Sequence, residues 1–246
     1  MTAGRVVLLG DLNIDALLSI PAYPAPGGDA LATQAQWQAG GSAANTAAGL
    51  ARLGQASRLL ARVGSDAWAG QALAALAQAG VDTTAVQHDP AAPTGLFFIT
   101  VTPDGERTMF GWRGANVRLD PCEVEPALAG AGWLHLSGYA LLEAPQREAA
   151  LRALAIAEAR GVPVSLDVGR LPAVQQPGLV RGLLPRLALC VLDLEAAQAV
   201  MGDAADPAKA AEAVTAAGVR LAALTLGAQG AHLRSGSQVV TQPAFP

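Results

Sequence analysis

Helix-like and strand-like segments alternate along most of the chain. Four Ala- and Leu-rich stretches have the length of helices, and apolar, β-branched runs separate them. The predicted helices, each with the glycine that ends it, are residues 43–53 with Gly54, 67–79 with Gly80, 145–160 with Gly161, and 207–217 with Gly218. The predicted strands include residues 6–9, 59–63, 163–167 and 221–226. This alternation predicts an α/β fold with a parallel sheet, right-handed crossovers and helices on both faces.

Local signals at the ends of the segments support these boundaries. A glycine just past the last helical residue adopts positive φ freely and is a common helix stop. Asp66 and the Asp206-Pro207 pair have the composition of helix N-termini.

Two stretches interrupt the alternation. Residues 31–37 alternate in polarity, and residues 95–102 and 107–113 flank the hairpin-turn sequence Pro-Asp-Gly-Glu. These stretches predict a small antiparallel β lid, formed by residues 16–39 and 95–113. The α/β core then consists of residues 1–15, 40–94 and 114–246. An extension of the main sheet at its edge is the alternative.

Two short polar segments are candidates for a ligand site. Residues 10–15 (Gly-Asp-Leu-Asn-Ile-Asp) follow an apolar strand, and alternation places Asp11, Asn13 and Asp15 on one face. Residues 40–45 (Gly-Gly-Ser-Ala-Ala-Asn) run into a predicted helix, and their small side chains allow close approach to the backbone. Carboxylates accept hydrogen bonds from hydroxyls, and amides both donate and accept. The two segments therefore predict a binding site for a ligand rich in hydroxyl groups.

Composition narrows the class of protein. The 246 residues are 52% hydrophobic and 15% charged, with a net charge of −4 and no basic cluster, which disfavours nucleic-acid binding. The chain has neither a run of the ~20 apolar residues that span a membrane nor a signal peptide, so we expect a cytoplasmic protein without membrane contact. Cys122 and Cys190 lack metal-type spacing and are expected to be reduced thiols.

The scarcity of lysine and the sequence around the first strand disfavour several catalytic and cofactor-binding mechanisms. Lys209 is the one lysine among 16 cationic residues, and a solvated position is predicted for it. Phosphate loops with a lysine, protein-kinase lysines and Schiff bases are therefore nearly excluded. The dinucleotide fingerprint is missing after the first strand. His135 lies in a strand-like run, where a structural role is favoured over catalysis.

Ordered motifs along the whole chain resemble those of the PfkB, or ribokinase-like, carbohydrate kinases. Besides residues 10–15 and 40–45, the matching segments are 63–66 (Val-Gly-Ser-Asp) with Gly70, 94–95 (Thr-Gly), 105–108 (Gly-Glu-Arg-Thr), 114–116 (Gly-Ala-Asn), 135–138 (His-Leu-Ser-Gly), Asp167 with Arg170, and 225–230 (Thr-Leu-Gly-Ala-Gln-Gly). The resemblance implies a three-layer α/β/α sandwich with a β lid. It also implies an ATP-dependent kinase acting on a hydroxyl of a sugar or nucleoside.

The resemblance also implies roles for residues. Substrate hydroxyls would be held by Asn13, Asp15, Gly40, Gly41 and Asn45. Arg113 either reaches the substrate or phosphate, or is a solvated edge charge. The nucleotide side would include Thr225, Gly227, Ala228 and Gly230 at the carboxyl end of a strand. The lid strands would form a homodimer interface.

Two features depart from the family pattern. Where the family carries Asn-x-x-Glu for Mg²⁺ and phosphate, this chain has Asp193, with Glu195 one residue early and Ala196 in the final position. Asp193 is therefore the candidate for the nucleotide and Mg²⁺. The family's Gly-Ala-Gly-Asp segment, with its catalytic base, is expected beyond Pro246, so no catalytic residue is assigned in this chain.

Three interpretations remain open at this point. The chain is an ATP-dependent sugar kinase, a catalytically impaired truncated kinase that at most binds a sugar, or the poorly folded product of an interrupted gene. The substrate also stays open, because adenosine, ribose, fructose phosphates and ketodeoxy sugar acids all fit the predicted hydroxyl-binding site.

Overall fold

The computed structural model describes residues 4–202 and 206–245 of the chain. Residues 1–3, 203–205 and 246, which fall in the predicted core segments, lie outside the described residues. Contacts divide the chain into two compact units, Met1–Leu9 with Asp120–Pro246, and Gly10–Leu119. Both predicted lid segments lie inside the second unit, together with residues predicted as core.

The first unit is built on a mostly parallel sheet. Its strands lie in the order β14-β13-β12-β11-β10-β9-β1, and all neighbours from β12 to β1 pair in parallel. The antiparallel pairs β12–β13 and β13–β14 form the other end. The strands are β1 (Arg5–Leu9), β9 (Ala131–Ser137), β10 (Val164–Asp167), β11 (Leu189–Asp193), β12 (Leu221–Thr225), β13 (Ala231–Ser235) and β14 (Gln238–Gln242).

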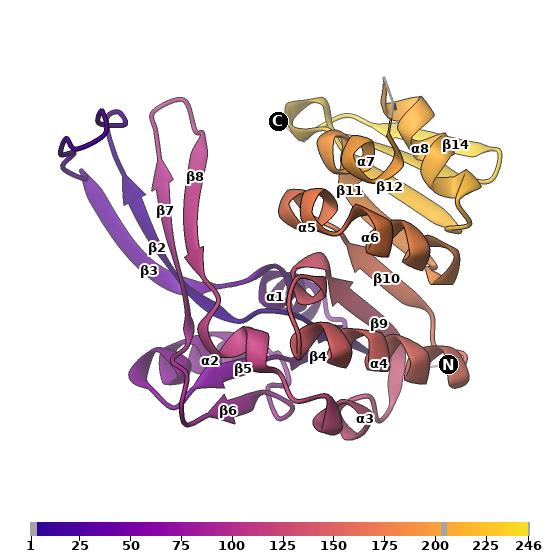
Figure 1. Cartoon of the computed structure of the whole chain (residues 1–246), viewed down its shortest axis with the longest axis horizontal. Coiled ribbons are helices and arrows are strands. Elements are labelled where there is room, and N and C mark those ends of the chain that lie inside the picture. The colour runs from indigo at the N-terminus through magenta and orange to yellow at the C-terminus, as the bar shows by residue number, and fades with distance from the viewer. Residues whose placement is uncertain (1–3, 203–205, 246) are drawn as a thin grey trace. The chain divides into compact units, whose positions relative to one another are not determined.

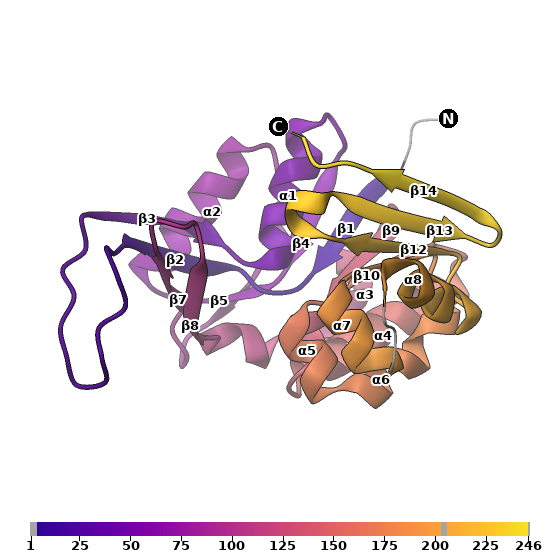
Figure 2. The same ribbon diagram turned by 90° about the horizontal axis from the view of Figure 1, so that it is seen from above.

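Helices of this unit lie on one side of the sheet, as Figure 2 shows for α4 to α8. Burial follows the same division, because successive residues of β11 alternate between half-buried and buried. The α-helices are α3 (Val124–Ala127), α4 (Gln146–Ala159), α5 (Arg170–Gln175), α6 (Pro177–Leu183), α7 (Leu194–Met201) and α8 (Pro207–Ala216), and the 3₁₀ turns are η2 (Pro121–Glu123), η3 (Gly138–Leu141), η4 (Leu184–Arg186) and η5 (Gly227–Gln229).

The second unit contains the lid strands and the helices at their base (Figure 1). Its elements are β2 (Asn13–Ser19), β3 (Gln34–Gly40), α1 (Ser42–Arg52), β4 (Ser57–Leu60), β5 (Arg62–Gly64), α2 (Ala67–Gln78), β6 (Gln87–Asp89), β7 (Gly95–Val101), β8 (Arg107–Trp112) and η1 (Gly114–Arg118). The lid is a four-stranded sheet of its own, in the order β3-β2-β7-β8, and is not an extension of the main sheet.

The lid sheet differs from the prediction in one pairing. β2–β3 and β7–β8 are antiparallel hairpin pairs, but the central pair β2–β7 is parallel. Both central strands start beside each other, with Asn13 opposite Gly95, so both run in the same direction. A parallel pair needs a long connection, and the segment through α1 and α2 supplies it.

The local signals at the helix ends are confirmed. Asp66 caps α2 by accepting the Ala69 N–H at 2.9 Å, and Asp206 caps α8 by accepting the Lys209 N–H at 2.9 Å. All four predicted glycine stops have positive φ, at Gly54, Gly80, Gly161 and Gly218.

Asp66 also joins two motifs that lie far apart in the sequence. Its carboxylate accepts both the backbone N–H and the hydroxyl of Thr94, each at 2.8 Å. The Thr94 hydroxyl accepts the Gly64 N–H in turn. Because Thr94 immediately precedes β7, the start of that central lid strand is fixed to the start of α2.

A buried carboxylate anchors η1 to the same unit. Asp89 is 1% exposed. Its Oδ2 accepts from Arg118 at 2.6 Å and Arg62 at 3.0 Å, and its Oδ1 accepts the backbone N–H groups of Ala91 and Ala92. The hydrogen bond from Arg118 is the largest influence that holds the Asp89 pKa well below its usual range. These bonds fix the turn that carries Asn116.

His135 is buried, with its Nδ1 at 2.9 Å from the Ser165 hydroxyl, and burial lowers its pKa. Its Nε2 is buried without a hydrogen-bond partner among the described residues, so the structural role favoured for it stays a prediction. Lys209 has a side chain that is 70% exposed. In the described parts of the chain, no helix has both the length and the hydropathy needed to cross a membrane.

Candidate functional site

Asn13 and Asp15 lie on one face at the start of β2. The neighbouring residues on both sides of Asn13 are glycines, since Gly40 of β3 and Gly95 of β7 stand opposite it. A Cβ added to Gly40 would overlap the Asp15 carboxylate, and one added to Gly95 would overlap the Asn13 amide. The glycines therefore provide the space in which these two polar side chains lie.

The Asp15 carboxylate is buried without a partner. The residue is 8% exposed, and no described residue donates a hydrogen bond to it. Burial raises its pKa to about 6, because the charged form is poorly solvated there. Because the carboxylate oxygens are not sealed from solvent, a ligand hydroxyl can reach them and donate to them.

Gly41 and Asn45 lie where β3 turns into α1. Gly41 has φ of 103°, and a Cβ there would overlap the Asp11 carbonyl, so only glycine fits. The Gly41 carbonyl accepts the Asn45 N–H at 2.9 Å. The exposed Asn45 side chain has no hydrogen-bond partner among the described residues. The structure thus brings Asn13, Asp15, Gly40 and Gly41 together at one end of the lid sheet, with Asn45 in the adjoining first helical turn.

Arg113 is engaged by Asp11. Its Nε and one terminal nitrogen each donate to an Asp11 oxygen at 2.8 Å, and the two side chains are 10% and 4% exposed. It is therefore not a solvated edge charge. Asp11 lies between β1 and β2 and belongs to neither strand, so the alternation that pairs Asn13 with Asp15 does not extend to it. This two-point ion pair joins the end of β8 to the start of β2.

Asn116 belongs to the motif of residues 114–116, but the sequence alone predicts no role for it. Asn116 is fully buried, and its amide contacts the backbone of Leu12 and the side chain of Asn13. The signal available in the sequence was its position in residues 114–116, just after the second lid hairpin.

The predicted nucleotide-side residues lie together in the first unit. Asp193 and Thr225 are register partners at the carboxyl ends of the parallel strands β11 and β12. Asp193 caps α7, and one of its oxygens accepts the Ala196 N–H at 2.6 Å. Within residues 4–202 and 206–245, no group of three or more His, Cys, Asp or Glu is placed to hold a metal ion.

The loop after β12 forms a tight turn. The Gly230 N–H donates to the Gly227 carbonyl, and the Leu226 N–H donates to the Gly230 carbonyl. Gly230 packs closely against residues 242–244, where a Cβ would overlap the Gln242 carbonyl. The N–H groups of Gly227 and Ala228 have no hydrogen-bond acceptor among the described residues. Such adjacent free amides form a site for anionic oxygens.

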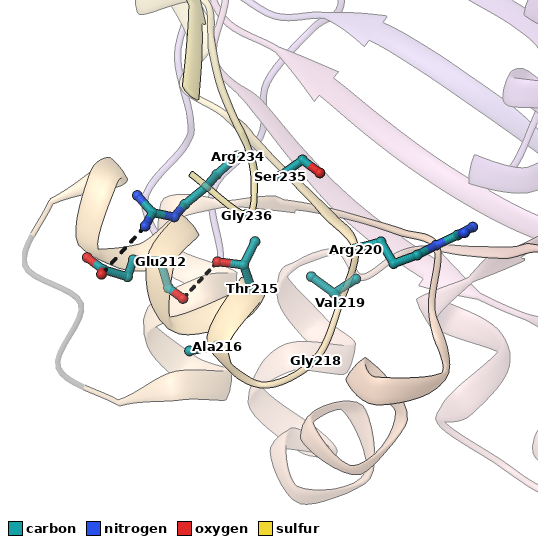
Figure 3. Close-up of a pocket in the computed structure, with 9 residues that line it drawn as sticks. All are labelled: Glu212, Thr215, Ala216, Gly218, Val219, Arg220, Arg234, Ser235 and Gly236. Carbon is teal, nitrogen blue, oxygen red and sulfur yellow. Dashed lines mark hydrogen bonds and ion pairs between the residues drawn. The ribbon is translucent and has the colours of Figure 1, made fainter. Parts of the chain in front are cut away.

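A separate shallow pocket lies at the opposite end of β12 (Figure 3). It has a volume of about 560 Å³ and lies between the end of α8 and the turn after β13. Arg234 pairs with Glu212 there at 3.6 Å, whereas Arg220 points away. Ligands of open α/β sheets bind at the carboxyl ends of the strands, so this pocket is not the candidate site.

A family model described as pfkB family carbohydrate kinase matches residues 3–246. The chain belongs to this family. The pfkB membership confirms the resemblance found in the motifs.

Among its relatives, the pfkB chain is 28% identical over 239 residues to a ribokinase of Staphylococcus aureus, covering 95% of this chain and 76% of that protein. It is 34% identical over 193 residues to a fructokinase of Klebsiella pneumoniae, covering 77% of this chain and 59% of that protein. A solved structure of a probable sugar kinase from Rhizobium etli superposes with a TM-score of 0.84 at 26% identity, covering 100% of this chain and 81% of that one. The predicted ribokinase-like fold class is confirmed, and a sugar kinase is the activity these relatives support.

Replacing Gly40 by alanine is expected to weaken sugar binding about tenfold or more, because the new Cβ occupies the place of the Asp15 carboxylate. Calorimetric titration with sugars measures the effect. Gly49→Ala in α1 is the matched control, since a Cβ there meets nothing within 4 Å. It is expected to stabilise the fold by about 0.5–1 kcal/mol and to leave sugar affinity unchanged. Equal affinities for both variants would contradict the proposed place of Asp15.

Asp15→Asn is expected to stabilise the ligand-free protein at pH 7–8 by about 1–2 kcal/mol, after allowance for solvent screening. The native pKa of about 6 lies above the ordinary value of 3.8, so ionisation of Asp15 at neutral pH opposes folding. The native state binds the proton more tightly, so the gain should disappear as pH falls from about 6 to about 4. Denaturant unfolding at several pH values measures it, and a gain that persists at pH 4 would contradict the assignment.

Proposed function

We propose that this chain binds a sugar at Asn13 and Asp15 and transfers the terminal phosphoryl group of ATP to one of its hydroxyls. One observation carries the proposal: a buried, unpartnered carboxylate in a glycine-lined space, in a member of a carbohydrate kinase family. Relatives named ribokinase and fructokinase make D-ribose and D-fructose the first candidates. The cytoplasmic location predicted from the sequence belongs to the same proposal.

The substrate side acts by positioning. Asp15 accepts hydrogen bonds from sugar hydroxyls, and the Asn13 and Asn45 amides add further bonds. Gly40 and Gly41 let the sugar approach the backbone. Arg113, which was predicted to reach substrate or phosphate, pairs with Asp11, and we propose that this ion pair holds the start of β2 in place. Fixing a hydroxyl in reacting geometry is a large part of catalysis of phosphoryl transfer.

The nucleotide side supplies donors for phosphate or ribose oxygens. We propose that the free N–H groups of Gly227 and Ala228 bind such oxygens, with Thr225 beside them and Gly230 shaping the turn. The second oxygen of Asp193, which the helix cap does not use, is the candidate contact for Mg²⁺ directly or through water. Mg²⁺ would neutralise phosphate charge when bound.

The reaction forms one bond and breaks another. The sugar hydroxyl oxygen bonds to the γ-phosphorus, the bond from that phosphorus to the bridging oxygen breaks, and ADP leaves with the electron pair. The hydroxyl proton passes to a base, which we do not assign to any residue of this chain.

An ATP-consumption assay with a panel that includes D-ribose, D-fructose and adenosine tests the proposal. Sugar-dependent ADP release is expected for at least one compound. Calorimetry on the same samples separates the alternative, a sugar-binding protein without turnover, which would give binding heat but no ADP. A folded protein that neither binds nor phosphorylates any compound would contradict both.

We also propose that the lid sheet forms a homodimer through the face opposite Asp15. Register places Trp37, Ala16, Phe98 and Phe110 in one row across the four strands, on that opposite face. Trp37, Phe98 and Phe110 are 46%, 44% and 60% exposed, and Trp112, at 58%, lies on the same face. Exposed aromatic patches of this kind are typical of protein interfaces. Part of this face is already covered, because Trp37 stacks on Trp68 of α2 at 5.1 Å.

Phe110→Glu is therefore expected to convert a dimer into a monomer, because a charge at the centre of an apolar interface is desolvated without a partner. Sedimentation velocity measures the molecular mass. Leu53→Glu, at an 85% exposed position at the end of α1, is the control and should leave the dimer intact. A wild-type monomer at ~50 μM, well above the Kd of a stable dimer, or a dimer insensitive to Phe110→Glu, would contradict the proposal.

A further inference from the structure

Asn116 is a fully buried amide whose oxygen accepts one hydrogen bond and whose two N–H protons are shared among three acceptors. Its Oδ1 accepts the Leu12 N–H at 2.9 Å. Its Nδ2 lies 2.8 Å from Asn13 Oδ1, 3.0 Å from the Arg113 carbonyl and 3.2 Å from the Leu12 carbonyl. All these partners belong to the second unit, at the base of the lid sheet.

Backbone groups fix which way the Asn116 amide points. A backbone N–H can only donate and a carbonyl can only accept, so Leu12 and Arg113 assign oxygen and nitrogen of the Asn116 amide without ambiguity. The nitrogen of Asn116 therefore faces Asn13, and Asn13 must present its oxygen in return. This turns the Asn13 nitrogen away from Asn116.

The outward nitrogen of Asn13 has no acceptor among the described residues. Asp15 stands two residues along the same strand face, and its carboxylate has no donor. The site thus offers one fixed donor and one fixed acceptor side by side. A sugar hydroxyl can accept from Asn13 while it or its neighbour donates to Asp15.

We propose that Asn116 is a positioning residue that holds the Asn13 amide with its nitrogen toward the sugar, so that the site presents a donor beside the Asp15 acceptor. This inference rests on the proposed sugar-binding function. Asn116 itself is too deeply buried to touch the sugar and acts through Asn13.

Asn116→Asp tests the role, because an aspartate keeps the acceptor for Leu12 but has no N–H for Asn13. The Asn13 amide then has to turn its nitrogen inward and present an oxygen beside Asp15. Calorimetry with D-ribose and D-fructose should show sugar affinity reduced about tenfold or more, with ATP affinity unchanged. In an Asn13→Ala background, the same substitution should change sugar affinity less than about threefold.

Equal losses in both backgrounds would overturn the proposal, because Asn116 would then act through general packing. Asn116→Ser is the second variant should Asn116→Asp fail to fold. It removes the N–H donors in a smaller side chain, and the same non-additivity with Asn13→Ala is expected.

Hydrogen exchange of side-chain amides decides the orientation without any sugar. In the ligand-free protein, Asn116 NH₂ protons should exchange at least about tenfold more slowly than those of Asn13, because they are buried and bonded. Equal protection of Asn13 would overturn the orientation. Absence of sugar heat in the wild type would instead contradict the proposed function, while the exchange comparison still decides how Asn13 points.

Discussion

Asp15→Ala is expected to weaken sugar binding by about 100-fold or more while ATP affinity stays within about threefold. The variant removes the acceptor that the fold leaves without a donor. Hydrogen bonds to a charged group contribute about 1.5–3 kcal/mol each, so loss of one or two accounts for this factor. Nucleotide contacts are proposed on other strands, at Asp193 and residues 225–230, so they should be unaffected. Isothermal titration calorimetry with each ligand separately gives both affinities.

Glu106→Ala is the control for that experiment. Glu106 is an exposed carboxylate in the turn between β7 and β8, so the variant also removes one negative charge from the lid. Sugar affinity should be unchanged. An equal loss of sugar and ATP binding in Asp15→Ala would indicate unfolding, and unaltered sugar binding would show that the sugar lies elsewhere.

Asp89→Ala is expected to lower the free energy of unfolding by about 3–5 kcal/mol. The substitution leaves Arg62, whose side chain is 18% exposed, without its carboxylate partner, and it frees the Ala91 and Ala92 N–H groups. The pKa of Asp89 is lower in the native state than in the unfolded state. The stability that the Asp89 carboxylate contributes is therefore fully present at pH values above its pKa in the unfolded state, and it is lost as pH falls below about 4. Denaturant unfolding, followed by the fluorescence of the tryptophans, measures the effect. Trp37, Trp68 and Trp112 lie in the second unit and report on its unfolding.

Asp82→Ala provides the comparison. Asp82 also pairs with an arginine, Arg58 at 2.9 Å, but its side chain is 22% exposed. Hydrogen bonds from Thr84 and Arg58 outweigh burial and lower its pKa to about 2. Partly exposed pairs contribute less, so a loss of about 1 kcal/mol is expected. Similar losses for both variants would contradict the distinction between a buried anchor and a surface pair.

Much of the fold was predictable because the signals are local. Helix α2 begins and ends where Asp66 and Gly80 indicate, and α8 follows the Asp206-Pro207 pair. The predicted strand 59–63 is instead two strands, β4 and β5, interrupted at Ala61, and β5 pairs with β6 in a sheet of its own. Residues 31–37 were predicted as a strand, but β3 starts at Gln34, opposite Ser19, the last residue of β2.

The sequence indicates which residues are candidates for the site, but it does not indicate which side chains contact one another there. The hydroxyl-binding candidates Asn13 and Asp15 lie in one strand, so alternation alone placed them on one face. The Arg113–Asp11 pair and the Asn116 contacts join residues about 100 positions apart in the sequence, and no local pattern encodes such a separation. Family resemblance marked Asn116 as part of a motif, and Arg113 was singled out by its place after the second lid strand, but only the structure shows what these two side chains contact.

The most direct measurement is a calorimetric titration of D-ribose and D-fructose into the wild-type chain at neutral pH, repeated with Asp15→Ala. The account predicts a saturable heat for at least one sugar in the wild type and a loss of that heat in the variant. No heat for either sugar in a folded wild-type protein, or the same affinity in the variant, would contradict the claim that the carboxylate in the glycine-lined space holds a sugar.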